Sequence, residues 1–74
     1  MIRILLVDDH ELFRSSLRLR LRLEHEDGIA PVGEAGTAEQ AVIKAHALQP
    51  DVVFLDLVLP RRNGYDIIPD LLPT

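Results

Sequence analysis

Two short apolar runs that each end in acidic residues constrain the fold of this chain more than any other feature. Ile2–Val7 is followed at once by Asp8 and Asp9, and the run from Asp51 to Leu55 is followed by Asp56. Apolar runs of this length, separated by a helical pattern, are typical of neighbouring parallel strands. Ligands of open α/β sheets bind outside the carboxyl ends of such strands. The sequence therefore predicts that three carboxylates meet at one rim of a sheet.

Such a cluster of carboxylates favours a cation. Like charges at close range raise one another's pKa values unless a positive charge lies among them. Oxygen ligands of this kind suit a hard divalent ion, above all Mg²⁺, which keeps several waters and uses one or two carboxylates.

The composition indicates one small globular domain. The chain has 74 residues, of which 47% are hydrophobic, and a domain of this size buries a modest core. Its 8 basic and 12 acidic residues give a net charge of −4, which argues against a nucleic-acid-binding surface in this chain. Cysteine is absent, and no signal-peptide or membrane-spanning pattern is present in the sequence. We therefore expect a soluble, cytoplasmic protein without a membrane partner.

The element order predicted from the patterns alternates strand and helix three times. Pro31 cannot donate to a ladder, so the second strand is expected at a sheet edge. Asp27 and Gly28 are expected to end the first helix, and Pro69 to shorten or kink the last one. The expected strands are Ile2–Val7, Ile29–Ala35 and Asp51–Leu57, and the expected helices are Glu11–Glu26, a helix opened by Thr37 and running to Leu48, and Tyr65–Leu72.

The stretch Leu17–Leu23 alternates leucine with arginine, a pattern that by itself indicates a strand. Its helix-forming residues and the length of the segment favour a helix with a wide apolar arc. Within that arc, Arg20 and Glu24 are spaced to pair. Thr37 with Gln40 is a capping-box pattern at the start of the second helix. The apolar arc of the first helix comprises Leu12, Phe13, Leu17, Leu19, Leu21 and Leu23, and the buried stripe of the second comprises Ala38, Ala41, Val42, Ala45 and Leu48.

With strands and acids placed, the sequence resembles the first part of a response-regulator receiver domain of two-component signalling, of the NarL/FixJ type. The resemblance rests on Ile4–His10, on Leu12-Phe13-Arg14, on Gly33-Glu34-Ala35 and above all on Pro50–Pro60 with Gly64 beyond. It covers almost the whole chain. It implies a flavodoxin-like (CheY-like) parallel sheet, here of three strands in the order second, first, third.

The resemblance also implies a chemistry. Asp56 would be the phosphoacceptor, taking a phosphoryl group from a histidine kinase. Asp9, Asp56 and the backbone carbonyl of Val58 would bind Mg²⁺, with Asp8 helping indirectly. Pro60 would shape the loop, and Gly64 would permit the turn into the last helix. Such a domain is a signalling domain rather than an enzyme, and it regulates transcription through a DNA-binding output domain.

By the same resemblance, residues 1–74 are a partial receiver domain that lacks strands four and five and the last two helices. The serine or threonine and the lysine that contact the phosphoryl group in the family have no counterpart, and Lys44 on the second helix does not replace that lysine. The third strand would then be an open edge, and part of the apolar arc of the first helix would be uncovered. This predicts a homodimer or oligomer, and the alternative function is that of a non-catalytic self-associating module.

Other interpretations are weaker. His10 is a possible metal ligand but is expected to start the first helix or face solvent, and His25 and His46 are expected on the surface. The arginines of the first helix are expected to form a solvated face. Arg61 and Arg62 are expected to be exposed loop charges, with steering of a kinase as the alternative. A haloacid-dehalogenase-like phosphatase needs a second aspartate two residues after the first, and a dinucleotide fold needs a glycine-rich turn; both patterns are absent.

Overall fold

The computed structural model of the protein describes residues 1–23, 28–59 and 62–72. Its central element is a parallel sheet of three strands. The strands are β1 (Ile2–Val7), β2 (Ile29–Ala35) and β3 (Val52–Leu55), and their order is β2-β1-β3. The predicted flavodoxin-like order is therefore confirmed. Pro31 lies in an edge strand as predicted, beside an irregularity in which Ile4 pairs with Pro31 and Leu5 with Gly33.

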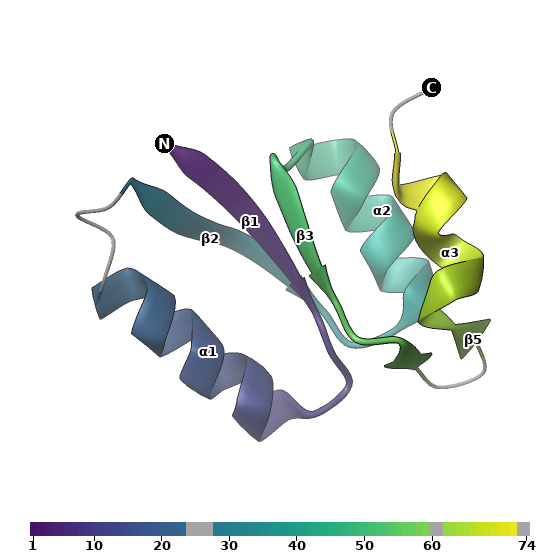
Figure 1. Cartoon of the computed structure of the whole chain (residues 1–74), viewed down its shortest axis with the longest axis horizontal. Coiled ribbons are helices and arrows are strands. Elements are labelled where there is room, and N and C mark those ends of the chain that lie inside the picture. Colours follow the sequence, from purple (N-terminus) through teal and green to yellow (C-terminus); the bar gives the residue numbers. More distant parts are fainter. Residues whose placement is uncertain (24–27, 60–61, 73–74) are drawn as a thin grey trace.

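Helices cover both faces of this sheet, but unequally (Figure 1). The first helix, α1 (Glu11–Leu23), packs on one face beside β2, while α2 (Ala38–Leu48) and α3 (Gly64–Leu71) lie on the other. The predicted end of the first helix at Glu26, its pairing of Arg20 with Glu24, and the surface position of His25 fall outside the described residues.

The third strand is shorter than predicted. It was expected to run from Asp51 to Leu57, but β3 ends at Leu55. The reason is the Asp56 side chain: its Oδ1 accepts a hydrogen bond from the Val58 N–H at 3.0 Å, which bends the chain away from the sheet. The pattern of β3, apolar on both faces, is typical of a central strand, yet within residues 1–23, 28–59 and 62–72 β3 pairs with β1 alone.

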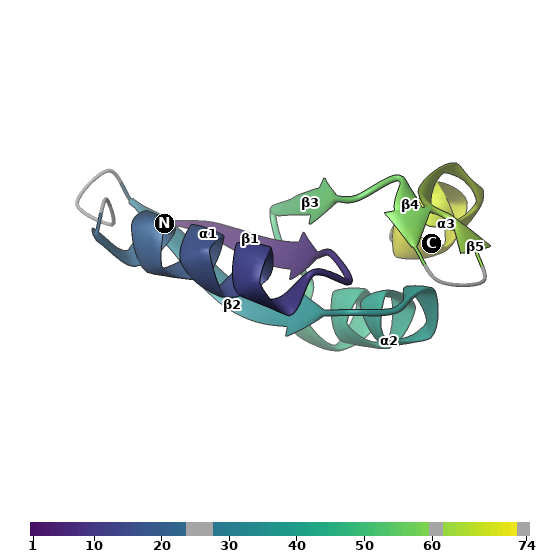
Figure 2. The same cartoon turned by 90° about the horizontal axis from the view of Figure 1, so that it is seen from below.

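A small antiparallel pair that the sequence did not predict follows this bend. It joins β4 (Val58–Leu59) to β5 (Arg62–Asn63). Figure 2 shows both beside α3, at the end of the molecule away from α1. Leu59, at 7% exposure, contributes to the core from this pair. Strands of two residues carry no periodicity, so no sequence pattern indicated them. The expected places of Pro60 and Arg61 lie outside the described residues.

Local capping confirms the predicted start of α2. Thr37 adopts an extended conformation and its hydroxyl accepts the Gln40 N–H at 3.2 Å. The Gln40 side chain returns to the N–H of Gly36, one residue before the cap, rather than to the N–H of Thr37 itself. The last helix is short, as Pro69 predicted, and Asn63 caps it by accepting the Tyr65 N–H at 2.8 Å.

The main core lies between the sheet and the pair α2 and α3. Leu5 and Val7 of β1 meet the buried face of α2 there, together with Ile67 of α3. The α2 residues of that face are Ala38, Ala41 and Ala45, with Leu48 partly buried. Small alanines let α2 approach the sheet closely, and the predicted stripe is confirmed apart from the partial exposure of Val42.

The opposite face is only half covered. Ile4 and Leu6 are buried under α1, but Leu12 is 81% exposed and Phe13 is 57% exposed. Phe54, which faces the same side from β3, is 42% exposed. The uncovered apolar arc predicted for the first helix is therefore present. Among the described residues, no helix is both long and apolar enough to span a membrane.

Candidate functional site

The carboxyl ends of β1 and β3 bring the acidic residues together. Val7 and Leu55 are register partners, so Asp8 and Asp56 begin their loops side by side. The Asp56 N–H donates to the Val7 carbonyl at 2.8 Å, and the Asp8 N–H donates to the Ala35 carbonyl of β2 at 3.0 Å. The backbone of both acids is thus held by the central strand and its neighbours.

Ligand atoms from four residues converge at this rim. One side-chain atom each from Asp8, Asp9, His10 and Asp56 lies within 4.8 Å of all the others. The predicted meeting of three carboxylates is confirmed. Asp9 is the most exposed of the three, at 33% of its side chain, while Asp8 and Asp56 are at 16% and 22%. The carboxylates are therefore shielded in part from water but remain accessible.

Asp8 and Asp56 form matching turns at the two strand ends. The Oδ1 of Asp8 accepts the His10 N–H at 2.7 Å, as the Oδ1 of Asp56 accepts the Val58 N–H. In each case an aspartate accepts from the backbone two residues on, which is a common way to end a strand. The same contact fixes the rotamer of each carboxylate.

His10 lies among the carboxylates, whereas its sequence context favours a place at the helix start or in solvent. Its Nδ1 is 2.8 Å from Asp8 Oδ1, 3.1 Å from Asp9 Oδ1 and 3.9 Å from Asp56 Oδ2. The hydrogen bond with Asp8 and the negative charges of Asp9, Asp8 and Asp56 raise the pKa of His10 above its ordinary value of 6.5. The ring itself is 72% exposed. His10 therefore faces solvent, as predicted, and also contacts the carboxylates of the cluster.

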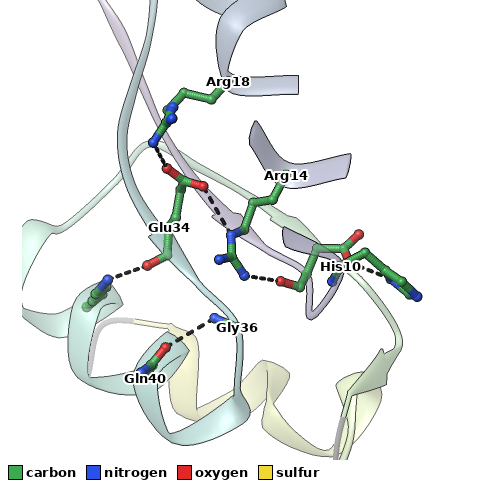
Figure 3. A network of polar contacts seen from close by, with 8 residues as sticks. His10, Arg14, Arg18, Glu34, Gly36 and Gln40 are labelled. Carbon is green, nitrogen blue, oxygen red and sulfur yellow. Dashed lines mark hydrogen bonds and ion pairs between the residues drawn. The ribbon is translucent and has the colours of Figure 1, made fainter. Parts of the chain in front are cut away.

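The prediction that the arginines of the first helix form a solvated face is wrong for Arg14 and Arg18, which belong to a polar network behind the site. Arg14 and Arg18 of α1 both reach Glu34 of β2 (Figure 3). Arg14 also donates to the backbone carbonyl of Asp8, and Lys44 of α2 donates to the backbone carbonyl of Glu34. The available signal was a lone acid in an otherwise apolar strand, with two arginines four residues apart on the neighbouring helix.

Gly64 has a different role from the one expected. It was predicted to permit a turn, but its conformation is not left-handed. A Cβ at this position would lie 2.6 Å from the Asp56 carbonyl oxygen and 2.6 Å from Leu57 Cα. Its N–H donates to the Leu57 carbonyl at 2.8 Å. Glycine is required here because the start of α3 contacts the backbone that follows the acidic site.

The remaining predicted surface residues lie away from this rim. His46 of α2 contacts the Asp70 carbonyl of α3 through Nε2 at 2.7 Å, and it is exposed. Lys44 of α2 points to the backbone carbonyl of Glu34 on β2.

Comparison with known proteins identifies the family. The family model "Response regulator receiver domain" matches residues 4–73. The chain belongs to the receiver-domain family of response regulators. The transcriptional regulatory protein BtsR of Salmonella typhi is 44% identical over 73 residues, which are 99% of this chain and 30% of BtsR. The chain therefore spans less than a third of the length of this relative.

Solved receiver structures show the same fold. A LuxR-family response regulator from Aurantimonas sp. SI85-9A1 is similar with a TM-score of 0.76 and 42% identity, over 86% of this chain and 44% of that chain. The response regulator domain of CheB from Thermotoga maritima gives a TM-score of 0.74 and 36% identity, over 86% of this chain and 46% of that one. The receiver domain identified here is thus of a kind found in transcriptional response regulators.

Proposed function

We propose that this receiver domain accepts a phosphoryl group on Asp56 from a histidine kinase. The observation that carries the proposal is the convergence of Asp8, Asp9 and Asp56 at the ends of β1 and β3. Family membership supports it, since the chain matches the receiver-domain model over residues 4–73. Asp56 follows β3, the shortest strand of the sheet, and its side chain is partly exposed, so a phosphodonor can approach its carboxylate.

The reaction is an in-line displacement on phosphorus. A carboxylate oxygen of Asp56 forms a bond to phosphorus while the bond between phosphorus and the donor imidazole nitrogen breaks. The electron pair of that bond stays on the nitrogen, and Asp56 becomes a mixed anhydride of carboxylic and phosphoric acid. Catalysis of this kind depends on positioning and on neutralising charge. The hydrogen bond from Val58 to Oδ1 supplies part of the positioning by fixing the Asp56 rotamer.

The donor set fits Mg²⁺. Carboxylate oxygens from three residues lie within one small volume, and partial exposure leaves room for the waters that Mg²⁺ retains. Asp9 and Asp56 would bind the ion directly, with the carbonyl of Val58, and Asp8 would act indirectly. When bound, the ion neutralises the charge that builds up on the phosphoryl oxygens. When protonated, His10 places a positive charge at the same carboxylates.

We further propose that the whole protein is a cytoplasmic transcriptional regulator. BtsR is described as a transcriptional regulatory protein and is more than three times as long as the matched region. In this proposal residues 1–74 are the first part of the receiver domain. The remaining strands and helices, the lysine that contacts the phosphoryl group and a DNA-binding output domain belong to the rest of the protein.

Self-association is a second proposal, and it concerns the 74-residue chain. Its supporting observation is the outer edge of β3, which pairs with no strand in the described part of the chain and where Val52 and Phe54 are 39% and 42% exposed. Unpaired edges invite pairing with another chain. A homodimer formed at this edge is compatible with the receiver function, which remains the better supported of the two.

The test of the receiver function is intact-mass spectrometry. The protein expressed from its full reading frame is incubated with Mg²⁺ and acetyl phosphate, and we expect the mass of one added phosphoryl group. Asp56→Asn should abolish the addition, whereas Asp66→Asn, an exposed aspartate on α3, should retain it. A wild-type protein that gains no mass, or an Asp56→Asn variant that still gains it, would overturn the proposal.

A further inference from the structure

We infer that Arg14 is a positioning residue that fixes the loop carrying Asp8 and Asp9 against β2. Its Nη1 donates to the Asp8 carbonyl at 2.5 Å, and its Nε donates to Glu34 Oε1 at 3.0 Å. The two contacts connect the loop after β1 to the end of β2 through one rigid guanidinium (Figure 3). Arg14 and Glu34 have side-chain exposures of only 18% and 20%, so water competes weakly for these bonds.

The carbonyl of Asp8 is an effective point at which to hold this loop. Three residues, Asp8 to His10, join β1 to the start of α1 at Glu11. The N–H of Asp8 is already bonded to Ala35 of β2. With Arg14 holding the carbonyl, both peptide groups that flank Asp8 are fixed to the same strand. The peptide that follows leads directly into Asp9, so the orientation of its carboxylate depends on this bond.

Arg18 provides an internal contrast. It donates to the other carboxylate oxygen of Glu34, carries the same charge as Arg14 and lies on the same helix. Its contact with Glu34 is more exposed, at 42% for the Arg18 side chain. Among the described residues, Arg14 donates to the Asp8 loop and Arg18 does not, so the pair separates loop positioning from general attachment of α1 to β2.

Gly36 makes the space that the guanidinium of Arg14 occupies. A Cβ at position 36 would lie 2.9 Å from Arg14 Nη1 and 3.9 Å from the Asp8 carbonyl oxygen. The backbone of Gly36 is not left-handed, so alanine is conformationally acceptable there. Gly36→Ala therefore displaces the guanidinium while leaving the charge of Arg14 in the protein.

The inference rests on the proposed function, because the position of the loop affects activity if Asp9 binds Mg²⁺ and Asp56 receives a phosphoryl group. Its test includes a readout that is independent of both. In metal-free protein, hydrogen exchange of the His10 amide reports the loop, since that N–H donates to Asp8 Oδ1 at 2.7 Å. Isothermal titration with Mg²⁺ and the rate of phosphorylation by acetyl phosphate then report the site.

The variants are Arg14→Met, Gly36→Ala and, as the matched control, Arg18→Met, all in the protein expressed from its full reading frame. We expect Arg14→Met and Gly36→Ala to speed exchange of the His10 amide and to raise the Mg²⁺ dissociation constant about tenfold, as when groups that orient metal ligands are removed. Arg18→Met should lower thermal stability to a similar extent but leave both readouts close to wild type. Arg14→Lys, which can reach one partner at a time, should restore part of the affinity.

Equal His10 exchange and equal Mg²⁺ affinity in the Arg14→Met and Arg18→Met proteins would overturn the inference. If Arg14→Met does not fold, the same comparison between Gly36→Ala and Arg18→Met decides. A wild-type protein that takes up no phosphoryl group would refute the proposed function alone, because the exchange and Mg²⁺ measurements on the variants would still test the loop.

Discussion

The two faces of the sheet differ in how completely they are covered. On the face of α2 and α3, Leu5 and Ile67 have no exposed surface, and alanines of α2 fill the space between helix and sheet. On the face of α1, a groove of about 740 Å³ runs between the helix and β3. Phe13 and Leu17 line it from one side and Phe54 from the other.

The covered face and the open face therefore contribute differently to the molecule. The covered face supplies the packing that holds β1, while the acidic rim lies at the open face, where Asp8, His10 and Asp56 also line the groove. The proposed exchange of a cation and a phosphoryl group at this site needs access to water and to a partner. A core needs the opposite, and the sheet separates the two requirements.

Truncating a buried leucine on the covered face should have the largest effect. Leu5→Ala is expected to lower the free energy of unfolding by about 2–5 kcal/mol, because it leaves a cavity in the main core. The matched substitution Leu12→Ala on the open face should cost about 0.5 kcal/mol or less, since that side chain is 81% exposed. Urea unfolding followed by circular dichroism measures both. Similar costs for the two would show that the faces are equally packed.

Much of the covered face could be predicted from the sequence, and the reason is burial. Ile2–Val7 and Ile29–Ala35 are strands with the predicted bounds because an apolar run in a parallel sheet leaves little choice of register or face. The alignment of Val7 with Leu55, and hence the meeting of the carboxylates, follows from the same pattern.

The rim was less predictable because individual side-chain hydrogen bonds decide its geometry. The end of β3 at Leu55 depends on a single side-chain bond of Asp56. The place of His10 depends on the turn made by Asp8, and the contact of Arg14 with Glu34 joins residues twenty apart. Such bonds leave no periodic trace in the sequence.

Charge placed on the open edge should weaken self-association of the 74-residue chain. Phe54→Lys puts a lysine on the edge strand β3, and a symmetric pair formed at this edge would bring two such lysines into one interface. Like charges across an interface are costly, so we expect the dimer dissociation constant to rise about tenfold or more. Sedimentation velocity over a concentration series measures it.

Ile43→Lys is the control for that experiment. Ile43 lies on α2 and is 68% exposed, so the substitution adds the same charge away from the edge. It should leave the dissociation constant unchanged. A wild-type chain that stays monomeric and folded at every concentration would contradict the edge-pairing proposal and show that the open face needs no partner.

Loss of the α2 cap should have a smaller effect, confined to the covered face. Thr37→Ala removes the hydroxyl that accepts the Gln40 N–H and should lower the free energy of unfolding by about 1 kcal/mol. Ser16→Ala, at an exposed position within α1, removes a hydroxyl without a capping role and should be neutral or slightly stabilising. Urea unfolding compares the two. A neutral Thr37→Ala would mean that packing alone fixes the start of α2.

The smallest effect is expected at the rim, from protonation of His10. Because the carboxylates raise its pKa in the folded protein above 6.5, the folded state binds the proton more tightly than the unfolded chain. The resulting stabilisation is complete below pH 6.5 and is lost as the pH rises through the folded pKa. Metal-free wild type should therefore melt at a higher temperature than His10→Gln. The difference between the two melting temperatures should be largest below pH 6.5 and should shrink at higher pH.

Titration of the His10 ring by NMR separates the causes of that shift. Asp8→Asn should lower the pKa of His10 more than Asp9→Asn, because the hydrogen bond to Asp8 is its largest cause. Added salt should reduce the part due to Asp9, since the ring is exposed and that interaction is through charge. A pKa of His10 at or below 6.5 in the wild type, or a melting difference from His10→Gln that does not vary with pH, would show that solvent at the open face screens the carboxylates completely.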